Sequence, residues 1–153
     1  MKTIGNGIIL SIRREHAQRI FEGSKLFELR KSLPTDSFRR VYLYETGGGG
    51  IIGCFDPVRI LRDKKELLWD KVNFKATTRS RFDRYFENYS EGCAIEVSNP
   101  VRFRASIPAR TLREIDPKFH VPMSSAPLRL ESPLGRFLER RRRLDRKGLE
   151  LVA

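Results

Sequence analysis

The stretch Gly23-Ser24-Lys25-Leu26-Phe27-Glu28-Leu29-Arg30 alternates apolar and charged side chains after a glycine. Such alternation predicts a strand, here over residues 25–31, because successive side chains of a strand point to opposite faces. Glu28 and Arg30 are two residues apart and are predicted to share one face, with Lys25 at the entrance. A strand that places lysine, glutamate and arginine side by side next to a glycine turn can line a polar cleft.

Two interpretations of the charged face remain open. Arg30 can bind a phosphate or a base edge through its forked N–H groups, and Glu28 can accept from an exocyclic amine or orient the arginine. Alternatively, the face is solvated and its Glu–Arg pair contributes little to stability. Spacing alone does not choose between them.

The elements on either side of this stretch are short. Before it, residues 8–13 predict a strand and residues 15–22 an amphipathic helix, which Gly23 ends in the left-handed conformation. After it, four glycines at positions 47–50 form a flexible connector, and Gly53 and Pro57 indicate a bulge or corner. Strands are predicted here over residues 40–45, 51–55 and 58–61.

Two helices and two strands are predicted next. One helix covers residues 63–72 with Asp63 as its N-cap, and the other covers residues 78–89, opened by Thr77 or Thr78. The two strands are residues 93–98 and 101–105.

After Pro108 the sequence contains frequent prolines and little periodic structure. This stretch is expected to wrap the surface of the domain, with a short helix over residues 111–115. Pro133 stands at a favourable first helical position for a final helix. We therefore expect one domain over residues 1–130 and a basic helix over residues 131–153, packed on that domain or extending from it.

Together these elements indicate an α+β fold. Five or six short strands with three or so inserted or flanking helices predict a small mixed β-barrel rather than a sandwich. Regular strand–helix–strand alternation, which would indicate an open parallel sheet, is absent.

Charge is the most informative bulk property. The 153 residues carry 31 Lys and Arg against 19 Asp and Glu, a net charge of +12. This balance favours a polyanionic partner through phosphate neutralisation and counterion release. The final helix holds four consecutive arginines that are candidates for holding a phosphate backbone: Arg140, Arg141, Arg142 and Arg143. The alternative is a solvated helix that improves solubility.

Aromatic residues offer candidates for stacking on an unpaired base. Tyr42 and Tyr44 share one face of their predicted strand, so their hydroxyls are expected at the rim of the cleft. Tyr85 belongs to the same candidate set, whereas Phe82 and Phe86 are expected in the core.

The order of these motifs resembles the ASCH domain family of the PUA-like superfamily. The resemblance rests on Gly-x-Lys-x-x-Glu-x-Arg at residues 23–30 after a first strand and helix, then on residues 40–44, 51–55 and 92–97. It covers residues 7–105. It implies a PUA-like barrel whose cleft is floored by the signature strand, and it implies RNA or DNA binding.

The resemblance also implies that a catalytic role is possible for Lys25 and Glu28. Some members are similar to amidohydrolases that deacylate acetylated cytidine, and one type is described as a ribonuclease. In the amidohydrolases the signature lysine is catalytic, alongside a threonine three residues later and a distant glutamate. Lys25 matches that lysine, but Glu28 stands where the threonine would be, and only Glu66 and Glu87 are candidates by region.

Other classes of function have little support in the sequence. Cys54 and Cys93 are expected to be buried thiols, and no ligand set for a metal is evident around them or the two histidines. No cofactor motif is recognised, and the Gly47–Gly50 run lacks the Lys and Ser/Thr of a phosphate loop. No apolar run approaches the roughly 20 residues of a membrane span. A cytoplasmic location is expected.

The leading hypothesis is a nucleic-acid-binding module, with RNA or another single strand favoured and a regulatory role possible. Its cleft would be lined by Lys25, Glu28 and Arg30. The alternatives are a hydrolase on a modified nucleoside or RNA that uses Lys25 and Glu28, and a protein-interaction module of a regulator complex.

Overall fold

The computed structural model describes residues 6–152, with side chains up to residue 148. Six strands form one mixed sheet in the order β2-β5-β4-β3-β1-β6, in which β1 runs parallel to β3 and every other pair is antiparallel. The strands are β1 (Asn6–Ile12), β2 (Phe27–Arg30), β3 (Val41–Glu45), β4 (Gly50–Lys64), β5 (Glu91–Ile107) and β6 (Ser125–Arg129).

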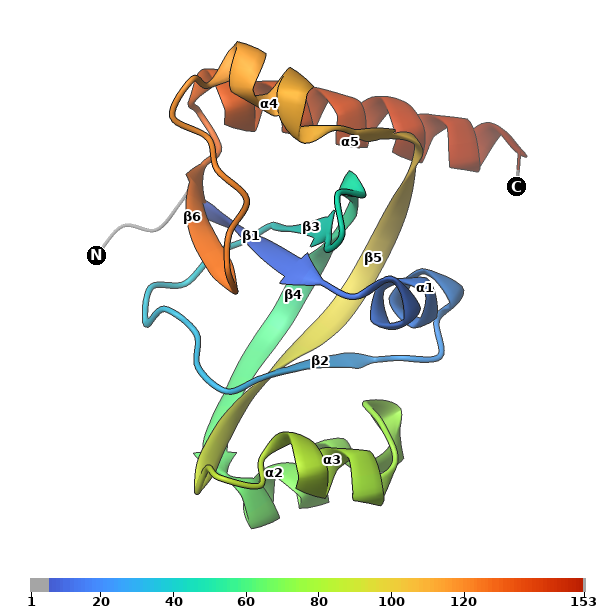
Figure 1. Cartoon of the computed structure of the whole chain (residues 1–153). Helices are drawn as coiled ribbons and strands as arrows, with labels where there is room; N and C mark the ends of the chain where they lie inside the picture. The colour runs from blue at the N-terminus through green and yellow to red at the C-terminus, as the bar shows by residue number, and fades with distance from the viewer. Residues whose placement is uncertain (1–5, 153) are drawn as a thin grey trace.

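The helices gather at the ends and on one side of the sheet (Figure 1). The pair α4 and α5 lies at one end of the β4–β5 ribbon and the pair α2 and α3 at the other, with α1 beside the middle. Their bounds are α1 (Arg14–Glu22), α2 (Lys65–Val72), α3 (Arg79–Tyr85), α4 (Ala109–Ile115) and α5 (Pro133–Val152), with the 3-10 helix η1 (Asn73–Lys75) after α2.

The structure confirms the α+β class but not the barrel. Within residues 6–152, β2 and β6 are the two edges of the sheet and do not pair with each other. They are only four and five residues long. The ends of the long β4–β5 ribbon are covered by helices instead of by a closing strand. The described residues contain five α-helices, where three or so were expected.

Several predicted breaks in strands are bulges. The pairing of β4 shifts register around Gly53 and between Pro57 and Ile60, yet the strand continues to Lys64. β5 likewise continues through Asn99, which has a positive φ of 48°. A bulge bends a strand without ending it, so four predicted strands are two long ones.

Two other local predictions were wrong. Residues 125–129, expected in a surface wrap, pair with β1 as β6. Helix α2 begins after Lys64 rather than after Asp63, whose carboxylate instead accepts from the Lys64 N–H. The predicted cap of the next helix is confirmed, because the Thr78 hydroxyl accepts from the Arg81 N–H.

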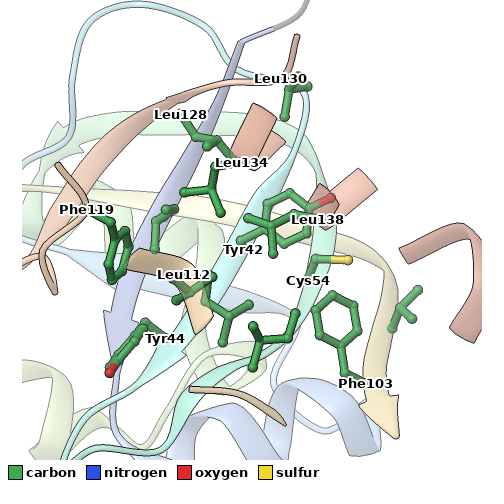
Figure 2. Close-up of a cluster of buried hydrophobic side chains, with 14 residues drawn as sticks. Tyr42, Tyr44, Cys54, Phe103, Leu112, Phe119, Leu128, Leu130, Leu134 and Leu138 are labelled. Carbon is green, nitrogen blue, oxygen red and sulfur yellow. The ribbon is translucent and has the colours of Figure 1, made fainter. Parts of the chain in front are cut away.

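Among residues 6–148, the buried side chains form three clusters. One joins β2 to α2 and α3, and contains Phe82 and Phe86 as expected. A second lies under α1. The third joins the sheet to α4 and α5, and Figure 2 shows Tyr42 and Cys54 of the sheet facing Leu138 of α5. No helix in residues 6–152 has the length and apolarity needed to cross a membrane.

Candidate functional site

A cleft of about 870 Å³ lies between α1 and α3, above β2. One wall is α1, the opposite wall is α3 with the turn before it, and the ends of β1 and β2 form the floor. Six basic side chains line it against three acidic ones: Arg13, Arg19, Lys25, Arg30, Arg81 and Arg84 against Glu15, Glu22 and Glu28. The cleft is therefore a positively charged hollow.

The predicted charged strand is the floor of this cleft. Lys25, Glu28 and Arg30 all line it, and each is buried, with 3%, 5% and 8% of its surface exposed. Exposure this low rules out a solvated strand face. The three residues therefore form a built polar site.

Glu28 holds this site together. Its Oε2 accepts from Nε of Arg30 at 3.0 Å and lies 2.9 Å from the second guanidinium nitrogen, while its Oε1 lies 3.8 Å from Nζ of Lys25. A buried carboxylate needs such partners, because an unpaired charge in the interior is costly. Arg30 is thereby held in one orientation at the base of the cleft.

Lys25 is turned inward by the end of α1. Gly23 takes a left-handed conformation (φ 86°), as predicted, and the following N–H groups of Ser24 and Lys25 both donate to the carbonyl of Arg19. The Lys25 ammonium then donates to the carbonyl of Ala76 at 3.0 Å. Burial lowers the pKa of Lys25 from its ordinary value, although Glu28 acts in the opposite direction.

Arg30 also fastens a distant loop to the floor. Its guanidinium donates to the carbonyl of Ser11 at 2.8 Å and to that of Ser124 at 3.3 Å. The Ser11 hydroxyl donates to the carbonyl of Pro122 at 2.5 Å. The segment before β6 is thus tied to the end of the cleft, and sequence spacing carried no signal of this contact.

The walls contain residues that the sequence did not single out. His16 and Arg19 of α1 face the cleft and lie 3.2 Å apart between Nδ1 and a guanidinium nitrogen. Arg81 and Arg84 line the opposite wall and are exposed. Helical spacing relates the residues within each pair, but only the folded chain shows that both pairs face β2.

The two tyrosines on β3 are not at the rim, which corrects the expectation for them. Tyr42 and Tyr44 are 0% and 2% exposed and belong to the cluster under α4 and α5. Tyr42 donates its hydroxyl to Glu139 of α5. The alternation on β3 was identified correctly, but the face that carries both rings is covered by helices. Among the candidate aromatics, Tyr85 lines the cleft and is 37% exposed.

Two of the four consecutive arginines of α5 pack against other side chains, and the other two are exposed to solvent. Arg142 is 9% exposed and its guanidinium lies 3.6 Å from Asp56. Arg141 is half-buried, with its guanidinium over the ring of Phe137 at 5.9 Å from the ring centre. Arg140 and Arg143 are exposed. None of the four lines the cleft.

The remaining candidates do not contribute to the cleft. Cys54 and Cys93 are buried free thiols, as predicted, and burial raises the pKa of Cys54 to about 12. Glu66 and Glu87 are exposed, and neither lines the cleft. Neither residue therefore takes the place of the distant glutamate that the resemblance would put beside Lys25.

No protein-family model and no curated protein sequence matches this chain. Solved structures do. A point variant of the ASCH protein from Zymomonas mobilis matches with a TM-score of 0.77 at 23% identity, over 87% of this chain and 94% of that one. The crystal structure of the ASCH protein from the same organism matches with a TM-score of 0.72 at 23% identity, over 86% and 93%.

A weaker likeness connects the chain to human THYN1 protein, solved in complex with DNA that contains 5-methylcytosine. That match has a TM-score of 0.52 at 11% identity, over 89% of this chain and 97% of that one. The stronger likenesses extend over most of both chains, and they agree with the resemblance of residues 7–105. The chain therefore has the fold of the ASCH domain.

Proposed function

We propose that this chain is a nucleic-acid-binding module whose cleft holds one unpaired base, with RNA favoured over DNA. The single observation that carries the proposal is the buried Lys25–Glu28–Arg30 floor of a positively charged cleft of about 870 Å³. A hollow of this size suits a nucleotide, and its polar groups are already oriented.

The floor offers groups that suit the polar edge of a base. The Oε1 of Glu28 can accept from an exocyclic amine, because Arg30 occupies mainly the other oxygen. Lys25 adds donors beside it. Tyr85, which is partly exposed on the wall, offers a ring face for stacking. Single-stranded RNA presents bases that can be splayed into such a site.

The surroundings support a polyanionic ligand. Arg81 and Arg84 line the rim, and Arg140 and Arg143 remain exposed on α5. We propose that these side chains contact the phosphate backbone, while Arg142 stabilises the packing of α5. Residues 1–130 would form the binding unit and residues 131–153 a basic helix upon it. The binding of methylcytosine-containing DNA by a protein of similar fold is consistent with this proposal.

Fluorescence anisotropy with single-stranded RNA, single-stranded DNA and duplex DNA at two salt concentrations tests the proposal. The variant Arg81→Gln/Arg84→Gln removes two rim charges. A matched control is Arg110→Gln/Arg113→Gln, which removes two exposed charges from α4 at the opposite end of the molecule (Figure 1).

We expect the rim variant to bind more weakly and to lower the salt slope by about 0.7 for each phosphate that the protein no longer neutralises. The control should change binding much less, because both variants have the same net charge but only one alters the cleft. Equal weakening in both variants, without preference among the ligands, would contradict the proposal.

A second candidate function follows from Lys25 alone. Burial lowers the pKa of this ammonium, and a lysine with a lowered pKa can act as a base or nucleophile. Lys25 and Glu28 would then act in a hydrolase on an acylated cytidine or on RNA. Product formation that is abolished in Lys25→Met, with the fold retained by circular dichroism, would support this activity. No turnover of acetylated cytidine or RNA by the wild type would reject it.

A further inference from the structure

His16, Arg19 and Lys25 lie close together on the α1 side of the cleft. A guanidinium nitrogen of Arg19 lies 3.2 Å from Nδ1 of His16. Because a guanidinium has donors and no acceptor, Nδ1 must accept this hydrogen bond. The imidazole is therefore neutral in this arrangement and carries its proton on Nε2.

The electrostatic surroundings keep the imidazole neutral. Burial lowers the pKa of His16, and the charge of Lys25 lowers it further, while Glu28 raises it. Burial likewise lowers the pKa of Lys25, and Arg19 and Arg30 add to that effect. Positive charge is thus crowded at this end of the cleft.

The supply of negative charge at this point is limited. Glu28 is the buried carboxylate nearby, and its Oε2 already accepts from Arg30. Within the part of the chain whose side chains the structure describes, Nε of Arg19 is buried and has no hydrogen-bond partner. A buried donor without an acceptor is uncommon and costs free energy. The site formed by His16, Arg19 and Lys25 therefore lacks one negatively charged hydrogen-bond acceptor.

A phosphate group supplies what these side chains lack. Its oxygens can accept from the fork of a guanidinium, from an ammonium and from a protonated imidazole at once. We propose that the α1 side of the cleft is a phosphate subsite formed by His16, Arg19 and Lys25, in which phosphate binding is coupled to the uptake of one proton by His16. This inference rests on the proposed function only for the source of the phosphate, which would be the nucleotide held in the cleft.

The coupling follows from the proton count at His16. In the empty site, Nδ1 uses its lone pair to accept from Arg19. When a phosphate binds, Arg19 directs its N–H groups to the phosphate oxygens, and Nδ1 takes a proton from solvent and becomes a donor. No covalent bond between heavy atoms forms or breaks. Phosphate binding should therefore strengthen as the pH falls, by up to about tenfold per pH unit for one linked proton.

Several charged groups face His16 and set the size of this effect. On α1 they are Glu15 and Arg19, and beside β2 they are Lys25 and Glu28. Across the cleft, α3 adds Arg81 and Arg84. Among these groups, Arg19 and Lys25 are assigned direct contact with the phosphate.

Proton NMR of the imidazole rings tests the subsite in the wild-type chain. The sequence contains two histidines, and His120 is exposed and away from the cleft, so it serves as an internal control. The pKa of both rings is measured with dimethyl phosphate, with methyl phosphate and with sodium chloride at equal ionic strength. The diester represents a backbone phosphate, and the monoester represents the terminal phosphate of a free nucleotide.

We expect the pKa of His16 to rise by about one unit or more with a phosphate ester relative to chloride, while that of His120 stays constant. A response to the diester assigns the subsite to a nucleic-acid backbone, and a response to the monoester alone assigns it to a terminal phosphate. Equal His16 pKa values in all three solutions would overturn the inference.

Arg19→Gln and Arg110→Gln extend the test as a pair of variants with equal charge, because Arg110 is exposed on α4 and does not line the cleft. Arg19→Gln should abolish the response of His16 to phosphate, and Arg110→Gln should keep it. The outcomes also separate this inference from the proposed function. A His16 response without oligonucleotide binding would reject the proposed function and keep the subsite. Oligonucleotide binding without a His16 response would keep the proposed function and reject the subsite.

Discussion

Arg40, the residue before β3, and Glu139 of α5 form a two-bond ion pair, with Nε to Oε2 at 2.9 Å and the second nitrogen to Oε1 at 3.2 Å. Arg40 also contacts Asp56 of β4, and Tyr42 donates to the same carboxylate of Glu139. Burial would raise the pKa of Glu139, but the hydrogen bonds from Arg40 and Tyr42 outweigh it and lower the pKa. This network fixes which face of α5 meets the sheet.

The variant Glu139→Ala should therefore destabilise the protein. It leaves Tyr42 without its acceptor and removes one of two carboxylates from the buried Arg40. We expect the free energy of unfolding in urea to fall by about 3 kcal/mol, as for other broken buried pairs. Glu131→Ala, at an exposed position, is the control and should change it by less than about 0.5 kcal/mol. Equal effects would show that the network is not stabilising.

Alanine substitutions of the neighbouring residues Arg142 and Arg143 should have different effects. Arg142→Ala should lower the melting temperature, because Arg142 is buried beside Asp56. Arg143→Ala should leave the melting temperature unchanged, because Arg143 is exposed, and should reduce the salt slope of nucleic-acid binding instead. Calorimetry and anisotropy on both variants check this division. Identical behaviour would argue against two roles within the run.

Removing Arg30 should affect stability as well as binding. Arg30→Ala leaves the buried Glu28 without its closest partner and releases the carbonyls of Ser11 and Ser124. We expect a decrease of about 3 kcal/mol in the free energy of unfolding in urea. Arg59→Ala breaks an exposed pair with Glu96 and should cost less than about 1 kcal/mol. A small effect at Arg30 would mean that the floor is less rigid than described.

His16 should make the fold sensitive to acid. Its pKa in the folded chain is lowered from the ordinary 6.5, so below that pH the unfolded chain binds more protons than the folded one. Stability is therefore fully present above pH 6.5 and falls as the pH drops toward the folded pKa, by less than about 1.4 kcal/mol per pH unit. Urea unfolding at about pH 7.5 and about pH 5.5, on either side of the ordinary pKa, should show a smaller pH difference for His16→Gln than for the wild type. If the pH difference in the free energy of unfolding were the same in His16→Gln and the wild type, His16 would not be the group responsible.

Local patterns predicted local structure well. The alternation of residues 25–31 identified both faces of β2, and Gly23 was correctly expected to end α1 in the left-handed conformation. The Thr78 cap and the start of the last helix at Pro133 were also correct. Each of these depends on side chains within a few residues of one another, and sequence spacing determines which of them meet.

Patterns failed where the meaning of a residue depended on a distant partner. The bulge or corner predicted at Gly53 and Pro57 is a bulge, but residues 51–55 and 58–61 were predicted as separate strands, and only the pairing with β5 shows that they are one. Tyr42 and Tyr44 alternate as a cleft rim would, yet α4 and α5 cover that face. A strand pattern reports which side chains share a face but not what packs against that face.

The sequence by itself determined that Glu28 and Arg30 share one face of a strand, because a strand places alternate residues on one side. It also determined the excess of positive charge, which favours a polyanion. Only the tertiary structure decided that His16, Arg19, Arg81 and Arg84 face this strand, and that Arg142 is buried while Arg143 is not. These contacts join segments that lie far apart in the chain, and packing between helices and the sheet selects them.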